Sequence, residues 1–274
     1  MEPVVHLRDA VALLGRFPAL AGINLDVARG EVVLLRGPNG AGKTTVLRVC
    51  AGLVPVVRGE AVVLGHDLRH DVRPVRRRVG LLGHATGLFD DLTVADNVTF
   101  WGRAYRASSA DISAALDLVG LSTRLRDVPV ARLSAGQRRR TSLACLLARR
   151  PELWLLDEPH AGLDHDARDL LDGLVRQAVG QGATVLMSSH ELERAEALAD
   201  RVVELDAGTA GPIAAATAAA APAAAATTPT ASAAPASPDL SAPAPSPVAP
   251  SAVAGAGHGG LPAPDLPTEV GHVA

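Results

Sequence analysis

Only one of the 26 lysine and arginine residues in this chain is a lysine, and it lies where a phosphate-binding loop needs one. The segment around Lys43 fits the pattern G-x-x-x-x-G-K-[ST] at every fixed position. Glycines allow the backbone N–H groups of such a loop to turn inward around phosphate oxygens. The Lys43 ammonium can follow the β- and γ-phosphates of a nucleotide, and the Thr44 hydroxyl can bind Mg²⁺. The predicted loop consists of Gly37, Pro38, Asn39, Gly40, Ala41, Gly42, Lys43, Thr44 and Thr45.

Further polar residues follow two apolar runs that have the length of buried strands. The run 153–156 ends in Asp157 and Glu158, and the run 184–187 is followed closely by His190. Such runs are typical of parallel strands covered by helices, and ligands bind at the carboxyl ends of these strands. The phosphate loop follows a third apolar run. We therefore expect the loop, the two acids and His190 to meet at one edge of a sheet.

The rest of the pattern predicts an α/β body with a helical insertion. Segments 4–7, 23–28 and 31–36 are expected strands, and the apolar spacing after the loop is that of a helix. Residues from about 84 to 150 are mostly helical in pattern, with an amphipathic stretch at 111–119.

Composition changes sharply near Ala210. Residues 210–274 are almost all Ala, Pro, Ser, Thr and Gly, and they contain no Lys or Arg. With so few large apolar side chains, this segment cannot bury enough surface to offset the entropy that ordering costs. We expect a disordered tail, and a passive tether is favoured over a docking segment.

Residues 1–209 carry equal numbers of acidic and basic side chains, which argues against a nucleic-acid partner. Cys50 and Cys145 lie in apolar helical patterns without metal-site spacing, so we expect both in the core. The body has no apolar run of about 18 residues that would span a membrane, and its start does not resemble a signal peptide. These features predict a cytoplasmic location.

Four more motifs resemble, in order, those of the ATP-binding subunits of ABC transporters, over residues 4–206. Residues 133–137 (LSAGQ) resemble the family signature LSGGQ, with Ala135 for a glycine. Residues 155–159 (LLDEP) resemble the Walker B strand, 161–164 (AGLD) the D-loop, and His190 the switch histidine. The resemblance implies a P-loop NTPase of class α/β, with a mostly parallel sheet core, an N-terminal antiparallel β part and a helical subdomain. The ATP-binding domain would comprise residues 1–209, with the helical subdomain at about 84–150.

The resemblance implies ATP hydrolysis with ATP and Mg²⁺ as cofactors. Asp157 would hold Mg²⁺ together with Thr44, because Mg²⁺ prefers a few hard oxygen ligands. Glu158 would polarise the attacking water as general base. His190 and Lys43 would stabilise the charge that develops on the γ-phosphate.

The same resemblance implies partners. Ser134, Gly136 and Gln137 would contact ATP held by an opposite subunit, so that one chain alone cannot complete the active site. We expect a second ATP-binding subunit, identical to this one, and transmembrane permease subunits at the inner face of the cell membrane.

Two positions depart from the family pattern. Leu14 and Gly15 occupy the place of an aromatic residue that stacks on adenine and the glycine after it, and Phe17 is the alternative stacking partner. His84 stands where the family has a glutamine that contacts the metal. Because imidazole is a poorer Mg²⁺ partner than an amide oxygen, we expect His84 to act through water or as a sensor toward the membrane subunits.

The surroundings of His84 also suggest a subfamily. Residues 82–84 (LGH), 134–140 (SAGQRRR) and 153–159 (LWLLDEP) resemble the haem-exporter ATPase of cytochrome c biogenesis, whereas residues 188–191 (SSHE) differ from its TTHQ. The leading hypothesis is therefore an ATPase subunit that powers export, with haem as the cargo. Export of a drug, lipid or antibiotic is the alternative. A non-transport ABC ATPase and a catalytically inactive regulatory module are less favoured.

Overall fold

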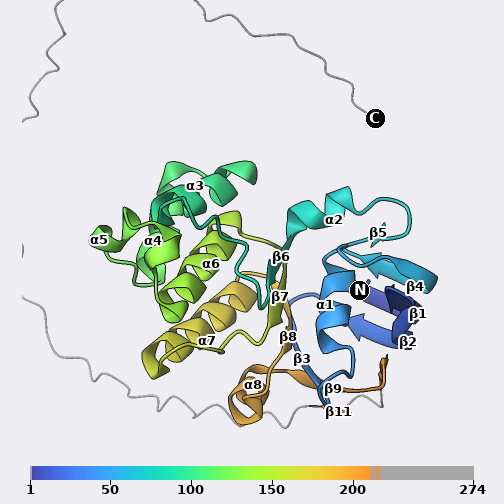
Figure 1. Cartoon of the computed structure of the whole chain (residues 1–274). Coiled ribbons are helices and arrows are strands. Elements are labelled where there is room, and N and C mark those ends of the chain that lie inside the picture. The colour runs from blue at the N-terminus through green and yellow to red at the C-terminus, as the bar shows by residue number, and fades with distance from the viewer. Residues whose placement is uncertain (1, 211–213, 216–274) are drawn as a thin grey trace, which may run out of the picture. The chain divides into compact units, whose positions relative to one another are not determined.

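The computed structural model describes residues 2–210 and 214–215, which form two β-sheets and a group of helices (Figure 1). The first sheet is antiparallel and has the strand order β2-β1-β4-β5. Its strands are β1 (Val5–Leu14), β2 (Phe17–Val27), β4 (Val56–Val63) and β5 (His66–Asp67). β1 runs seven residues past the segment predicted from the sequence. The register shifts beyond Leu7, where Asp9 adopts a φ of 47°, and this irregularity breaks the alternation that would have revealed the whole strand.

The second sheet has seven strands and contains the parallel core predicted from the apolar runs. Its main path is β10-β9-β3-β8-β7-β6, and β11 also pairs with β9. β3, β6, β7, β8 and β9 are parallel, whereas β10 and β11 run antiparallel to β9. The strands are β3 (Val32–Arg36), β6 (Val79–Leu82), β7 (Leu153–Asp157), β8 (Thr184–Ser188), β9 (Arg201–Asp206), β10 (Thr209–Ala210) and β11 (Ala214–Ala215).

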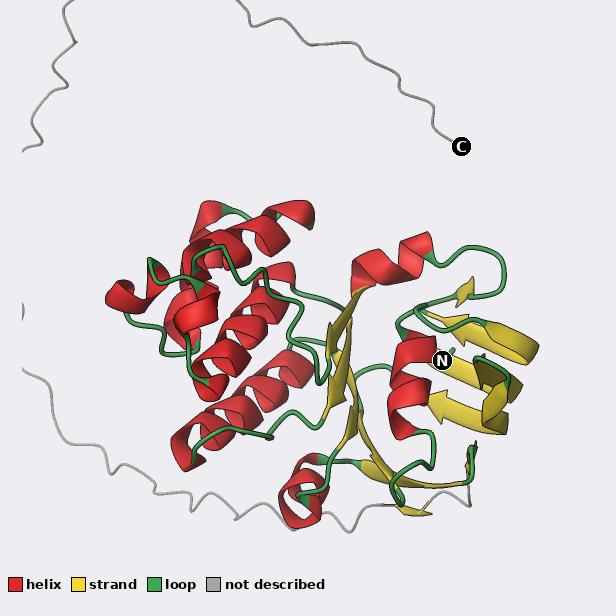
Figure 2. Cartoon of the chain, viewed as in Figure 1, coloured by secondary structure: helices red, strands yellow, loops and turns green. Residues whose placement is uncertain are grey.

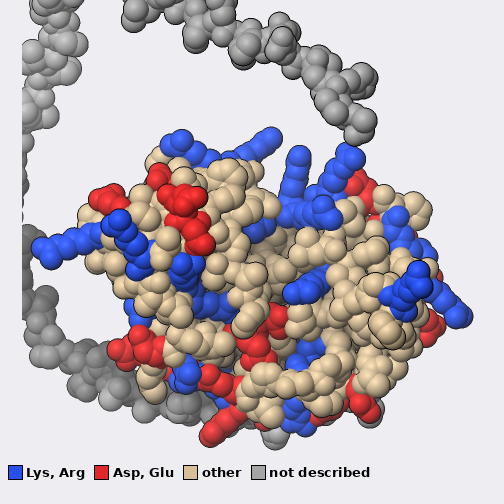
Figure 3. All heavy atoms as spheres, viewed as in Figure 1, with Lys and Arg blue, Asp and Glu red and all other residues tan. Residues whose placement is uncertain are grey.

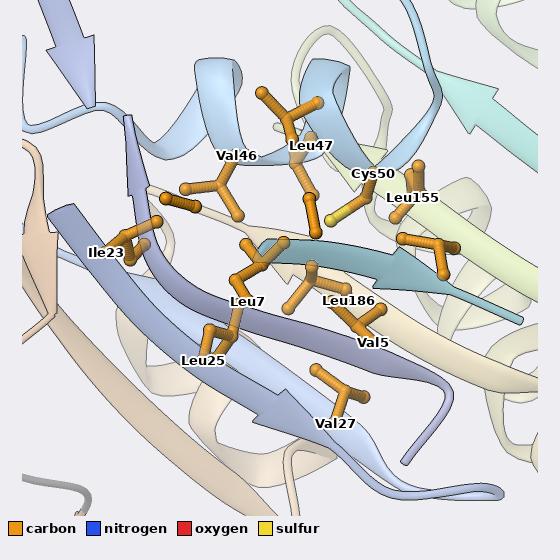
Figure 4. Packing of buried hydrophobic residues seen from close by; sticks show 14 of the residues in the cluster. Val5, Leu7, Ile23, Leu25, Val27, Val46, Leu47, Cys50, Leu155 and Leu186 are labelled. Carbon is orange, nitrogen blue, oxygen red and sulfur yellow. The ribbon is translucent and has the colours of Figure 1, made fainter. Parts of the chain in front are cut away.

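Helix α1 (Lys43–Cys50) fills the space between the two sheets. Its Val46, Leu47 and Cys50 pack against Leu7 of the antiparallel sheet and Leu186 of the parallel sheet (Figure 4). Successive residues of a strand point to opposite faces, so Val33 and Leu35 of β3 join this cluster while Val32 and Leu34 face the other side. Full burial of each such aliphatic side chain contributes roughly 1.5–3 kcal/mol. The packing therefore fixes the start of α1, and with it the phosphate loop.

The remaining long helices lie on the opposite face of the parallel sheet (Figure 2). They are α3 (Val94–Ala104), α4 (Ser109–Leu118), α6 (Ala135–Arg149) and α7 (His165–Gly180); shorter helices are α2 (Arg73–Arg78), α5 (Thr123–Arg126), the 3₁₀ turn Val130–Arg132 and α8 (Leu192–Leu198). Thr93, Ser108 and Ser134 cap the starts of α3, α4 and α6 by accepting a backbone N–H bond. Each of these helices therefore begins directly after its capping Ser or Thr residue.

The predicted tail boundary at residue 210 differs from the structure at its first residues. Ala210 and Ala214–Ala215 pair with β9, because backbone groups alone suffice to add a short strand to a sheet edge. The rest of the predicted disordered tail lies outside the described residues. Cys50 and Cys145 are both buried, as expected. Among the residues that the structure describes, no helix has the length and apolar character needed to cross a membrane.

Candidate ATP-binding and hydrolysis site

The phosphate loop joins the end of β3 to the start of α1, and close contacts require two of its glycines. A Cβ atom at Gly37, where φ is 151°, would lie 2.2 Å from the carbonyl oxygen of Leu205. A Cβ at Gly42, where φ is 99°, would lie 2.9 Å from the carbonyl oxygen of Ala19. Gly42 is the N-cap of α1 and provides no side-chain cap, so the first N–H groups of this helix are available to an anion.

The loop lines a cavity of about 370 Å³ that collects most of the predicted site. Lys43 is 8% exposed, and its Nζ donates to the carbonyl oxygens of Gly37 at 2.7 Å and Pro38 at 3.0 Å. The ammonium is thus held inside the loop, poised to exchange these carbonyls for phosphate oxygens. The cavity is lined by Leu14, Ala19, residues 39–45, His84, Asp157, Glu158 and His190. The structure therefore brings the loop, both acids and both histidines together.

Asp157 at the end of β7 is positioned for a magnesium site. The Thr44 hydroxyl donates to its carboxylate at 2.9 Å, and the Ser188 hydroxyl donates to it at 2.7 Å. The described residues contain no group of three or more His, Cys, Asp or Glu side chains that could hold a metal ion. A hydroxyl and one carboxylate suit Mg²⁺, which keeps several waters and takes further oxygens from nucleotide phosphates. The residues present therefore fit Mg²⁺.

Glu158 and His190 pair at the edge of the cavity. One carboxylate oxygen of Glu158 accepts the backbone N–H of His190 at 2.8 Å, and the other lies 3.4 Å from His190 Nε2. Glu158 adopts a φ of 49°, a left-handed conformation that is unusual for a residue with a side chain. Such strain persists only where surrounding contacts hold it, and it is frequent at functional sites. The backbone conformation of Glu158 and its contacts with His190 thus fix the direction of the Glu158 carboxylate.

Arg139 contacts the backbone of this site, although the sequence shows it only as one of three adjacent arginines. It is 7% exposed, and its guanidinium donates to the carbonyl oxygens of Gly83 at 2.5 Å, Asp157 at 3.1 Å and Glu158 at 2.8 Å. Burial lowers the pKa of Arg139, while the charges of Asp157 and Glu158 oppose that shift. No periodicity in the sequence separates Arg139 from its half-buried neighbours, because only the tertiary fold places carbonyl groups around it.

The signature residues lie apart from the cavity. Ser134 and Gln137 form a reciprocal capping box at the start of α6, in which each side chain accepts the backbone N–H of the other residue at 3.2 and 3.0 Å. Gly136 approaches the D-loop, where a Cβ would lie 3.3 Å from the carbonyl oxygen of Gly162. None of the three lines the cavity beside Lys43. Their predicted contact with ATP therefore requires a nucleotide held elsewhere.

Comparison with known proteins decides which family shares this arrangement. The model of the ABC transporter family matches residues 20–161. The chain belongs to the ABC transporter family. It is 41% identical to the daunorubicin resistance ATP-binding protein DrrA3 of Streptomyces coeruleorubidus over 76% of this chain and 66% of that protein. It is 38% identical to the Nod factor export ATP-binding protein I of Rhizobium meliloti over 71% of this chain and 59% of that protein.

A solved ABC structure shares the fold. A dimeric ATP-binding cassette in a post-hydrolysis state, bound to ADP and Pi, superposes with a TM-score of 0.70 and 25% identity, over 77% of this chain and 98% of that one. This chain spans about three fifths of the length of the curated relatives it matches. What the comparisons show is therefore the family of this domain, an ABC transporter domain.

The two departures from the ABC pattern have distinct surroundings. Leu14 lines the ATP cavity, whereas Phe17, the alternative stacking residue, is 80% exposed and absent from the cavity lining. Of the two candidates, Leu14 therefore borders the cavity and Phe17 does not. His84 is exposed and lines both this cavity and a second cavity, and Asp157 also lines both. Lining these cavities does not by itself give His84 a contact with a metal ion.

Proposed function

We propose that this chain hydrolyses ATP to power export of a small molecule across the cytoplasmic membrane, and that the molecule is haem. The chemistry is supported by the pairing of Glu158 with His190 beside the phosphate loop. A carboxylate that faces a phosphate cavity can take the proton of an attacking water. A neighbouring imidazole can stabilise charge on the γ-phosphate, provided it is protonated or presents an N–H.

Each residue of the cavity then has a defined task. Lys43 moves from the Gly37 and Pro38 carbonyls to the phosphates, and the N–H groups at the start of α1 hold the same oxygens. Bound Mg²⁺ would supply positive charge against the β- and γ-phosphates. Thr44 and Asp157 would hold the ion, while Glu158 orients the water and His190 keeps Glu158 in place.

A second copy of the chain would complete the site. Ser134 and Gly136 stand at the start of α6, where free N–H groups and the helix dipole favour an anion, yet they do not line the Lys43 cavity. Their use as a phosphate site therefore needs ATP from another subunit. The dimeric state of the solved relative supports this arrangement. A homodimer is the simplest assembly that one chain can form.

The permease is proposed to dock at the second cavity, of about 510 Å³. Apolar side chains line it together with His84; among them are Leu53 after α1, Leu81 of β6 and Trp101 of α3. Phe89 and Phe100 extend this apolar surface, since they pack on each other and on Trp101 and are 43% and 49% exposed. Basic side chains gather beside it around α2 (Figure 3). Because His84 lines both cavities, it is placed to sense the permease.

The cargo assignment rests on the sequence around His84 and in the signature and Walker B segments, which resemble the haem-exporter ATPase. Export of a drug or antibiotic is a second candidate, favoured by similarity to proteins named for daunorubicin and linearmycin resistance. Both candidates use the same ATPase site. They differ in the permease, and the experiment must therefore identify that partner.

The test is purification of the tagged chain from its native membranes in mild detergent, with identification of the polytopic proteins that co-purify. Haem export predicts that the co-purifying membrane protein binds haem. It also predicts that added haem changes the ATPase activity of the complex. A partner that instead responds to an antibiotic would move the assignment to drug export. A complex without any polytopic protein would overturn transport. A Trp101→Glu variant is the matched control, because it should lose the permease yet keep ATP binding.

A further inference from the structure

A buried histidine lies two residues beyond Glu158. His160 is 1% exposed, and its Nε2 lies 2.7 Å from Oδ1 of Asp172 on α7. The second oxygen of Asp172 accepts a hydrogen bond from Arg194 Nη1 on α8 at 2.5 Å. His160, Asp172 and Arg194 therefore form a continuous chain of polar contacts, which we call the His160 relay. It joins the segment after β7 to the segment after β8.

Burial of the polar groups of the His160 relay lowers the stability of the folded state. Asp172 is 7% exposed, and within the described residues His160 Nδ1 is buried without a hydrogen-bond partner. A buried polar group without a partner costs about 1–3 kcal/mol, and apolar residues of similar volume often replace buried ionic contacts without loss of stability. If position 160 served stability alone, a leucine there would stabilise the fold more than the histidine does. The geometry points instead to a role in placing the neighbouring residues.

The segment after β7 and the segment after β8 also meet at Glu158 and His190. There Glu158 accepts the N–H of His190 at 2.8 Å. Farther along the same two segments, His160 and Arg194 are joined through Asp172. An ion pair between Arg168 of α7 and Glu191, at 3.1 Å, also joins these segments. Three contacts therefore hold the segment after β7 to the segment after β8.

We propose that His160 is a positioning residue for ATP hydrolysis, which acts through Asp172 and Arg194 to keep His190 against Glu158. The left-handed backbone of Glu158 needs contacts on both sides to persist. Arg139 contacts the Glu158 carbonyl from α6, and the His160 relay joins the chain two residues beyond Glu158 to α7 and α8. This inference rests on the proposed ATPase function and adds to it a residue that does not touch the nucleotide.

The test compares two substitutions in the full-length chain. His160→Leu keeps the volume and removes the N–H donor, so kcat should fall about tenfold while the KM for ATP stays within about twofold. His160→Gln can place an amide N–H near the Asp172 carboxylate, and it should restore kcat to within about threefold of the wild type. A merely structural role would lower Tm in both variants without this split between kcat and KM.

The chain offers a matched control. His6, Asp26 and Arg8 form the same kind of His–Asp–Arg contact in the antiparallel sheet, away from the cavity. His6→Leu should leave kcat unchanged. If His160→Leu does not fold, Arg194→Gln breaks the relay at its more exposed outer end and should lower kcat several-fold at unchanged KM.

Three outcomes would overturn the proposal. The first is an active His160→Leu enzyme with wild-type kcat, and the second is an unchanged kcat for Arg194→Gln. The third is an equal loss of kcat in His160→Leu and in His160→Gln. Failure of the ATPase function itself looks different, because the wild-type chain would then have no activity against which any variant could be compared.

Discussion

Arg139 donates a hydrogen bond from Nη2 to the backbone carbonyl of Glu158 at 2.8 Å, and so joins the signature helix to the residue proposed as general base. The same guanidinium also holds Gly83, immediately before His84, at 2.5 Å. One buried cation therefore links α6, the end of β7 and the segment after β6. Movement of the helical part relative to the sheet would be transmitted to Glu158 through this contact.

Replacement of Arg139 by Gln should reduce both stability and catalysis. The shorter side chain leaves several buried carbonyls unpaired, so the free energy of unfolding should fall by about 2–4 kcal/mol. ATP turnover should fall at least about tenfold because Glu158 loses one of its supports. Urea denaturation and a coupled ATPase assay measure the two effects. Arg138→Gln is the control, since Arg138 binds Asp90 at the surface and should change neither quantity appreciably.

Glu158→Gln should abolish ATP turnover and preserve ATP binding. The amide has nearly the same shape, and it can still accept the His190 N–H, but it cannot take a proton from water. Turnover is measured by phosphate release and binding by equilibrium dialysis of radiolabelled ATP. Turnover close to that of the wild type would show that another group acts as the base.

The sequence predicted the parts of this site that depend on local pattern. Gly40 and Gly42 of the loop, Asp157 at the end of one strand and His190 just beyond another follow from spacing and strand polarity, and the structure places them around one cavity. Arg139 and His160 escaped prediction, because their partners lie 12 to 56 residues away in the chain and only tertiary packing makes them neighbours. The extent of β1 was missed for a different reason, namely the irregularity at Asp9.

Asp157→Asn should weaken the response of the site to Mg²⁺ more than it weakens nucleotide binding. The amide still accepts from Thr44 and Ser188, yet it lacks the charge that a divalent ion requires. The Mg²⁺ concentration for half-maximal ATPase activity should rise about tenfold or more. Binding of ATP measured in EDTA should match that of the wild type. An unchanged Mg²⁺ titration would remove Asp157 from the metal site.

The two cysteines should respond to pH as groups that ionise only on unfolding. Burial raises the pKa of both Cys50 and Cys145 to about 12. In the unfolded chain a thiol ionises near pH 8.5. Between these values the unfolded state loses its thiol protons while the folded state keeps them, so stability falls as pH rises. The contribution of each thiol is fully present below about pH 8.5 and is lost progressively toward pH 12.

This behaviour can be measured in two ways. A thiol reagent at pH 8 should label neither cysteine in the folded chain, and both after denaturation in guanidinium, because buried protonated thiols are unreactive. The urea midpoint should fall between pH 8 and pH 10. In the Cys50→Ala, Cys145→Ala double variant that fall should be smaller by roughly 4 kcal/mol, since each of the two thiols contributes about 1.4 kcal/mol per pH unit over the roughly 1.5 units above its unfolded pKa. Rapid labelling of the folded chain would contradict the burial of Cys50 at the end of α1, and with it the packing that fixes the phosphate loop.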